Sequence, residues 1–165
     1  MAVHPLTNER WGFSSNCFVC EPNNAAGLRI PFEHDDEAGV VRATFTLDER
    51  FSGAPAYVHG GVTLSVLDEA MAWATIAIGE RFAVTSETTT RFGHAVKVGR
   101  TYTVEARLER SDGDTMQTSA TVLDHLGRSC VEASATFTVL GQAQAVDVLG
   151  VEDLGDDASF LRDRA

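Results

Sequence analysis

One long apolar segment, residues 60–78, constrains the fold of this chain more than any other feature. It contains no proline, and its apolar side chains recur at the 3.6-residue period that places them on one broad helical face. A helix with so few polar residues is buried on most of its sides. A narrow row of small residues with a single charge runs along the opposite face, and we expect this row to meet another protein surface. The row is Gly61, Ser65, Asp68, Ala72, Thr75 and Gly79.

Strand-like segments lie on both sides of this helix. They alternate apolar and polar residues, and short turns containing Gly and Asp separate them, as in antiparallel hairpins. No second long helix is present to support a parallel sheet. The sequence therefore predicts an α+β fold, in which an antiparallel sheet of about six strands wraps around one central helix. The expected strands are 28–33, 40–47, 82–92, 101–111, 115–123 and 129–140. Pro31 cannot donate to a sheet ladder, which favours an edge position for the first of them.

The chain fits one domain, because 165 residues are enough for one core and few for two. We expect a turn-rich N-terminal segment over residues 1–27 with a short helix at Asn8–Phe13, a folded domain over 28–141, and an acidic, weakly ordered tail over 142–165. No apolar run reaches the roughly 18 to 20 residues of a membrane span, and the N-terminus lacks the apolar region of a secretory signal. These features favour a cytoplasmic protein.

The charge balance limits the partners. Acidic residues outnumber basic ones 24 to 13, which gives a net charge of −11 with neutral histidines. Binding to duplex nucleic acid depends on many Lys and Arg contacts to phosphate, and docking to an anionic membrane needs a basic cluster. We therefore expect neither nucleic acid nor a membrane as partner.

The chain has three cysteines, Cys17, Cys20 and Cys130. A small and odd number of cysteines does not indicate a disulfide framework. The Cys17-x-x-Cys20 pair lacks a second Cys or His pair that would complete a structural zinc site, and no helix-forming segment follows it directly. We expect reduced thiols near a turn, with no metal and no cofactor.

The segment Tyr57-Val58-His59-Gly60-Gly61 begins the helix. The first N–H groups of a helix have no acceptor within it and carry the positive end of its dipole, so they suit an anion or a developing oxyanion. The two glycines would let a ligand approach the backbone closely. The alternative is a loop that needs glycine only to turn into a buried helix.

Asp68 is the second candidate for chemistry. Burial raises the pKa of a carboxyl group and makes it a plausible general base or nucleophile, although Asp68 could instead form a pair across an interface. Glu69, off the small-residue row, is expected to be solvated or paired. Asp68 lies eight residues beyond Gly60, about 12 Å along the helix, which is too far for both to act on one carbonyl. If both are catalytic, they come from two subunits of an isologous dimer with antiparallel helices.

These residues resemble those of the hotdog-fold acyl-CoA thioesterases of the phenylacetic-acid-degradation (PaaI-like) type, whose hallmark is His-Gly-Gly followed by an acidic residue on the central helix. The matching motif is His59-Gly60-Gly61 with Asp68. Three longer stretches are also similar to the family, and the likeness extends over about residues 17–140. They are FSGAPAYVHGG, TSETTTRFGHAVKVG and CFVCEPNNAAGLRIPF.

The resemblance implies roles for these residues. The Gly60 N–H would polarise the thioester carbonyl, and Asp68 of the other subunit would activate water or attack directly. His59 would position the thioester, unless it is only a loop residue bonded to the backbone, and Thr85 would assist Asp68. Family members often carry Asn or Gln where this chain has Gly53, and Pro where it has Ala95.

The implied substrate is an acyl-CoA, bound by a homodimer or a dimer of dimers. Gly61 and Tyr57 would contact it. Its phosphates would need cations, for which Arg91, Lys97 and Arg100 are candidates, although each could be a solvated strand-end charge. Tyr57, Trp73 and Phe92 would line the acyl pocket. The rival functions are a hotdog dehydratase or hydratase and a non-catalytic acyl-CoA-binding module.

Overall fold

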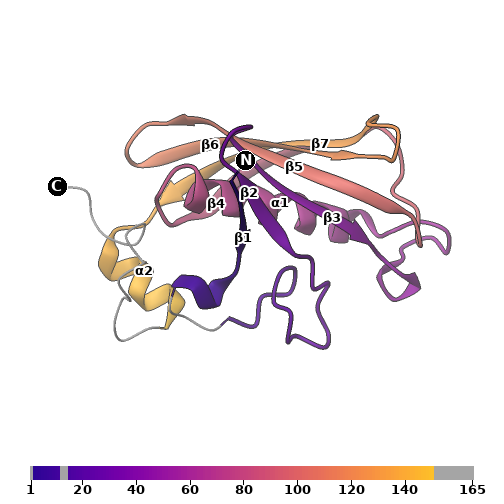
Figure 1. The fold of residues 1–165 in the computed structure, drawn as a ribbon, viewed down its shortest axis with the longest axis horizontal. Helices are drawn as coiled ribbons and strands as arrows, with labels where there is room; N and C mark the ends of the chain where they lie inside the picture. The colour runs from indigo at the N-terminus through magenta and orange to yellow at the C-terminus, as the bar shows by residue number, and fades with distance from the viewer. Residues whose placement is uncertain (1, 12–14, 151–165) are drawn as a thin grey trace.

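The computed structural model describes residues 2–11 and 15–150 of the chain. Within these residues, seven strands form one antiparallel sheet that curls around helix α1 (Gly60–Ala77), as predicted (Figure 1). The spatial order of the strands is β1-β2-β3-β5-β6-β7-β4. Their bounds are Val3–Leu6 (β1), Phe32–Asp35 (β2), Val40–Thr46 (β3), Ala83–Phe92 (β4), Thr101–Ser111 (β5), Thr115–Leu123 (β6) and Ser129–Val139 (β7).

The N-terminal segment differs from the prediction. Strand β1 pairs with β2 and forms the sheet edge. We expected the strand at Pro31 to lie at the edge, but β2, which follows Pro31, lies inside the sheet between β1 and β3. The strand predicted at 28–33 begins only at Phe32, because Arg29 has a φ of 54° that no extended strand tolerates. A short 3-10 helix covers Asn8–Trp11 at the predicted place, and Phe13 lies outside the described residues.

Two further elements complete the fold, the 3-10 helix Glu49–Phe51 and helix α2 (Gln142–Leu149). Helix α2 lies in the segment that we expected to be a weakly ordered tail, and it is anchored by Ala145, which is fully buried. Residues 151–165 of that segment lie outside the described residues. In the described part of the chain, no helix has both the length and the apolar character needed to cross a membrane.

Helix α1 packs its broad apolar face into the curl of the sheet. Val66, Leu67, Ala70 and Ala74 are completely buried there, as the periodicity predicted. The opposite row of small residues is only partly free. Ser65, Asp68 and Ala72 are half-buried, but Thr75 is buried within this chain, and Met116 of β6 covers Gly79. The row therefore offers its first three turns to a partner, and the prediction was wrong for its C-terminal end.

Strand β4 is the other edge of the sheet. It pairs with β7 on one side only, and the side chains of residues 84–89 are exposed in the single chain. An edge strand of ten residues with open backbone groups is a template for pairing with a second strand.

Candidate active site

Helix α1 begins at Gly60, and His59 is its N-cap. The Gly61 N–H donates a hydrogen bond of 2.9 Å to Nδ1 of the His59 ring. Because Nδ1 accepts, the neutral ring carries its proton on Nε2. The Gly61 N–H is thus occupied by His59, and contact of Gly61 with a substrate stays a prediction.

Gly60 keeps a free N–H at this helix end. Its N–H has no acceptor among the described residues, and the residue is exposed. A Cβ placed on Gly60 would lie 3.7 Å from the ring of Phe92, in ordinary van der Waals contact. A Cβ placed on Gly53 would lie 3.3 Å from the Cα of His59, a close contact, so a larger residue at position 53 would require His59 to shift. The geometry leaves the Gly60 and Val62 N–H groups without an acceptor among the described residues at the positive end of the helix dipole, and Gly60 carries no side chain to cover its own N–H.

Asp68 lies two turns further along α1 and receives a hydrogen bond from strand β4. The Thr85 hydroxyl donates to Asp68 Oδ1 at 2.7 Å. The ladder between β4 and β7 shifts register between Thr85 and Glu87, which is a bulge of the kind that redirects a side chain next to a site. The structure thus brings together the two residues that sequence analysis paired.

The single chain does not bring Gly60 and Asp68 together. They are separated by eight residues of one continuous helix, about 12 Å along its axis. No single carbonyl can be within hydrogen-bond reach of both.

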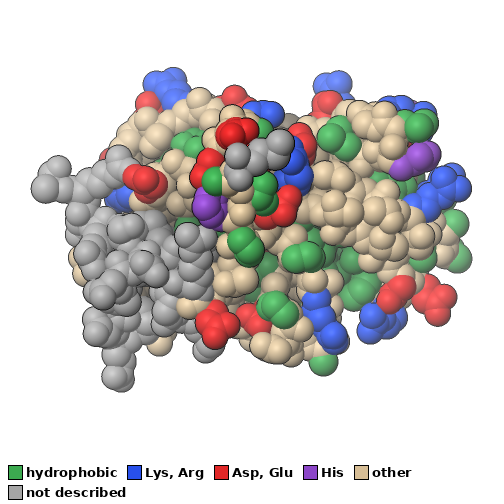
Figure 2. All heavy atoms as spheres, in the orientation of Figure 1, with side chains coloured by type: hydrophobic (Ala, Val, Ile, Leu, Met, Phe, Trp, Pro, Cys, Tyr) green, Lys and Arg blue, Asp and Glu red, His purple; other side chains and the backbone are tan. Residues whose placement is uncertain are grey.

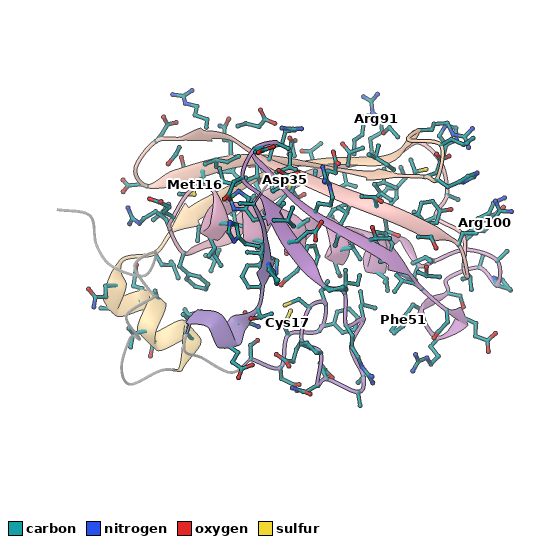
Figure 3. The ribbon with its side chains drawn as sticks, viewed as in Figure 1. Cys17, Asp35, Phe51, Arg91, Arg100 and Met116 are labelled. Atoms are coloured by element: carbon teal, nitrogen blue, oxygen red, sulfur yellow. The ribbon has the colours of Figure 1, made fainter. Side chains whose placement is uncertain are left out.

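A cavity of about 290 Å³ lies near the loop that follows β4. It contains Tyr57, Lys97 and Arg100, three of the residues expected to contact substrate. Sequence analysis missed four further polar residues of its lining. His94 lies in the same loop as Lys97, whereas Asp124, His125 and Arg128 come from the turn between β6 and β7. Figure 2 shows basic and histidine side chains at the end of the molecule where Figure 3 labels Arg100.

Arg91 does not belong to this cavity. It lies on β4 opposite Glu132 of β7, and Figure 3 places it away from Arg100. The expected cluster of three cations is therefore a pair, Lys97 and Arg100. Arg128 lies nearby, but its guanidinium is bound to Asp124 at 2.8 Å.

A second cavity, of about 300 Å³ and largely apolar, lies between α1 and β4. Trp73 lines it, and so does Thr85, whose hydroxyl is bonded to Asp68. Tyr57 and Phe92 do not line it. The remaining apolar lining is Ala72, Ile76, Phe82, Ala83, Val84, Phe137 and Leu149.

The N-terminal loop closes one wall of this cavity with Cys17, which meets Glu69 of α1. Cys17 Sγ and Glu69 Oε1 are hydrogen-bonded at 3.4 Å. The hydrogen bond to the Cys20 thiol lowers the pKa of Cys17 to about 5, and the same contact with burial raises the pKa of Cys20. Burial raises the pKa of Glu69 to about 8. Glu69 is thus paired, one of the two states that we expected, but with a cysteine.

Comparisons with known proteins agree with this architecture. A family model described as thioesterase superfamily matches residues 56–138. A crystal structure described as a thioesterase superfamily protein superposes with a TM-score of 0.70 at 27% identity, over 79% of this chain and 64% of that one, less than two thirds of its length.

Two more distant structures share the fold. PaaI from the phenylacetic acid degradation operon of E. coli has a TM-score of 0.62 at 20% identity, over 69% of this chain and 81% of that one. A Streptococcus mutans UA159 protein bound to acetyl CoA has a TM-score of 0.59 at 23% identity, over 62% of this chain and 82% of that one. The curated proteins contain no significant match.

Proposed function

This chain belongs to the thioesterase superfamily, and from that membership and the geometry of its site we propose that it hydrolyses an acyl-CoA thioester to a free acid and CoA. The observation that carries the proposal is the Asp68 carboxylate, held by Thr85 beside an apolar cavity on the side of α1 that the sheet leaves open. A module that only bound its ligand would have no use for a positioned base there.

In the proposed reaction, Asp68 takes a proton from water as the water oxygen attacks the thioester carbonyl. The oxyanion that forms accepts a hydrogen bond from the Gly60 N–H of the other subunit. The C–S bond then breaks, the acid is released, and the CoA thiolate recovers the proton from Asp68. In direct attack, Asp68 would bond to the thioester carbonyl carbon and the C–S bond would break, giving an anhydride and CoA thiolate. Water would then cleave the anhydride to the free acid and the Asp68 carboxylate, and the proton released would go to the CoA thiolate. His59, fixed through Nδ1, would present Nε2–H towards the thioester.

The reaction requires two chains, and we propose a homodimer or a dimer of dimers. The half-buried residues Ser65, Asp68 and Ala72 leave α1 open to a second copy, and the exposed β4 edge is open to pairing. An antiparallel arrangement of two α1 helices would set Gly60 of one chain against Asp68 of the other. We propose residues 28–141 as the thioesterase domain.

Lys97, Arg100 and Tyr57 would bind the CoA moiety. The phosphates of CoA are anionic, and the chain has a net charge of −11, which repels them. The two cations in this cavity would offset that repulsion and bind the phosphates. The apolar cavity lined by Trp73 would hold the acyl group. Its volume of about 300 Å³ suits a medium chain or an aryl group.

The test is CoA release from short, medium, long and aryl acyl-CoA substrates. We expect Asp68→Asn to lower turnover at least about a hundredfold. Asp112→Asn, an exposed carboxylate in the β5–β6 turn, is the matched control and should keep wild-type turnover. Hydration of enoyl-CoA without hydrolysis would indicate the dehydratase or hydratase class. Tight binding without any turnover would indicate a binding module.

A further inference from the structure

Three potential ligand atoms from two distant segments meet at the wall of the apolar cavity. They are Sγ of Cys17, Sγ of Cys20 and a carboxylate oxygen of Glu69, and all lie within 4.8 Å of one another. Figure 3 shows Cys17 in the N-terminal loop, which lies beneath the sheet and α1. The proposed hydrolysis uses none of the three groups.

The loop that carries the two cysteines is a fixed turn. The Cys20 N–H donates to Cys17 Sγ at 3.3 Å, and the Glu21 N–H donates to the Cys17 carbonyl at 3.3 Å. Backbone bonds of 2.8 Å from Leu28 to Phe18 and from Ile30 to Val19 hold the turn against the following segment. A sulfur that accepts a backbone N–H within such a turn is stabilised as a thiolate, the form that binds metals.

The surroundings of the second sulfur also fit a metal-bound thiolate. Asn8 is buried, and its Nδ2–H points to Cys20 Sγ at 3.9 Å. Groups outside the ligand set that donate to the ligands are the usual supports of a metal site.

Among the described residues, no Lys, Arg or His forms an ion pair with the Glu69 carboxylate. The carboxylate instead accepts a hydrogen bond from the Cys17 thiol. Two thiols and one carboxyl gathered out of water need a cation if they ionise together.

We propose that Cys17, Cys20 and Glu69 bind one zinc ion. Thiolate and carboxylate ligands suit zinc, and Zn–S bonds of about 2.3 Å place two sulfurs within the observed spacing. Because tetrahedral zinc takes four ligands, a water molecule would complete the set. Sequence analysis excluded a metal because it sought a second Cys or His pair, whereas the third ligand is a glutamate of α1.

The metal site is favoured over a Cys17–Cys20 disulfide because of Glu69. A disulfide makes no use of a carboxyl group and would deprive Glu69 of its thiol partner inside the protein. Zinc uses all three groups and would fasten the N-terminal loop to the residue that adjoins Asp68.

The experiment uses the full chain, reduced and freed of metal by a chelator that is then removed. Cobalt is titrated as a spectroscopic substitute for zinc, and zinc content is measured by elemental mass spectrometry. We expect one equivalent of cobalt with a thiolate-to-metal charge-transfer band and the visible bands of a tetrahedral ion. Zinc should displace the cobalt.

Three variants separate the proposed site from other thiols. Cys20→Ser should abolish the charge-transfer spectrum, and Glu69→Gln should weaken cobalt binding at least about tenfold. Cys130→Ser, a buried cysteine on β7 outside the cluster, is the matched control and should bind as the wild type does. Circular dichroism checks the fold of each variant, and the isosteric Glu69→Gln decides the matter if Cys20→Ser does not fold.

The proposal is overturned if the reduced wild-type chain takes up no cobalt. It is also overturned if Glu69→Gln binds as tightly as the wild type, or if Cys130→Ser loses the spectrum as fully as Cys20→Ser. If the protein is isolated with a Cys17–Cys20 disulfide, and the reduced protein binds no metal, the pair would be assigned to redox chemistry instead.

Discussion

Thr85 Oγ1 on strand β4 donates a hydrogen bond of 2.7 Å to Asp68 Oδ1 on helix α1. The contact joins the edge of the sheet to the side of the helix that faces away from the core. Within residues 2–11 and 15–150, no other group donates a hydrogen bond to the Asp68 carboxylate, so its second oxygen can bind water. The bulge between Thr85 and Glu87 explains how an edge strand delivers a hydroxyl to this point.

The first prediction concerns this contact. Thr85→Val keeps the shape of the side chain but removes the donor, and we expect turnover to fall about tenfold to a hundredfold, the effect of losing a hydrogen bond to a charged group. Thr85→Ser restores the hydroxyl and should recover most of the activity. Wild-type turnover in Thr85→Val together with a loss in Thr85→Ser would mean that the methyl group, and not the hydrogen bond, matters at this position.

The regular elements were predictable because their patterns are local. Helix α1 and strands β5 and β6 follow directly from periodicity over nine or more residues. Strand β1 was missed because it has four residues and includes Pro5, a sequence that reads as a loop until β2 pairs with it. The positive φ of Arg29, which delays β2, has no signal in the local sequence.

Residues of the candidate sites could be predicted from the sequence only where they lie close together in one segment. His59, Gly60 and Asp68 lie on one helix and its cap, so spacing sufficed. The cation cavity combines the loop after β4 with the β6–β7 turn, and His125 and Arg128 belong to it through topology alone. Glu69 joins Cys17 across 52 residues, a contact that required the folded N-terminal loop.

The second prediction tests the CoA contacts. Lys97→Ala and Arg100→Ala should each raise KM for acyl-CoA about threefold to tenfold with little change in kcat, as expected for the loss of a charge-assisted contact near solvent. Arg91→Ala is the control, since it lies outside the cavity. Acyl thioesters of N-acetylcysteamine carry no phosphate, so their KM should not respond. A response as large as that of acyl-CoA would assign the two residues to another role.

The third prediction concerns acid stability. Hydrogen bonds from the backbone N–H groups of Arg128 and Leu126 to Asp124 lower its pKa below the ordinary value of 3.8. Because the folded pKa lies below the unfolded one, Asp124 stabilises the fold fully above pH 3.8, and this contribution is lost as pH falls through the folded pKa. In urea unfolding, Asp124→Asn should therefore lower stability at pH 7 and flatten its decline below about pH 4. A parallel decline in both proteins would contradict this account.

The last prediction asks whether Gly60 and Asp68 share a site across two chains. Asp68→Asn removes the base from one chain. Gly60→Val in a second chain covers the helix N–H, and the structure has room for the added side chain, because a Cβ on Gly60 makes only ordinary contact with Phe92. In the mixed dimer, one site receives an intact Gly60 from the first chain and an intact Asp68 from the second, while the other site receives both lesions.

Each homodimer of these variants should be nearly inactive, whereas the heterodimer should recover up to about half of the wild-type rate, because one of its two sites is whole. Native mass spectrometry would verify that heterodimers have formed, and a mixture of Asp68→Asn with Asp68→Ala supplies the control, since neither of its sites can be restored. Heterodimers without recovered activity would mean that the two residues act in separate places. An active monomer at micromolar concentration would contradict the two-chain site altogether, because about 12 Å of helix separates the donor from the base within one chain.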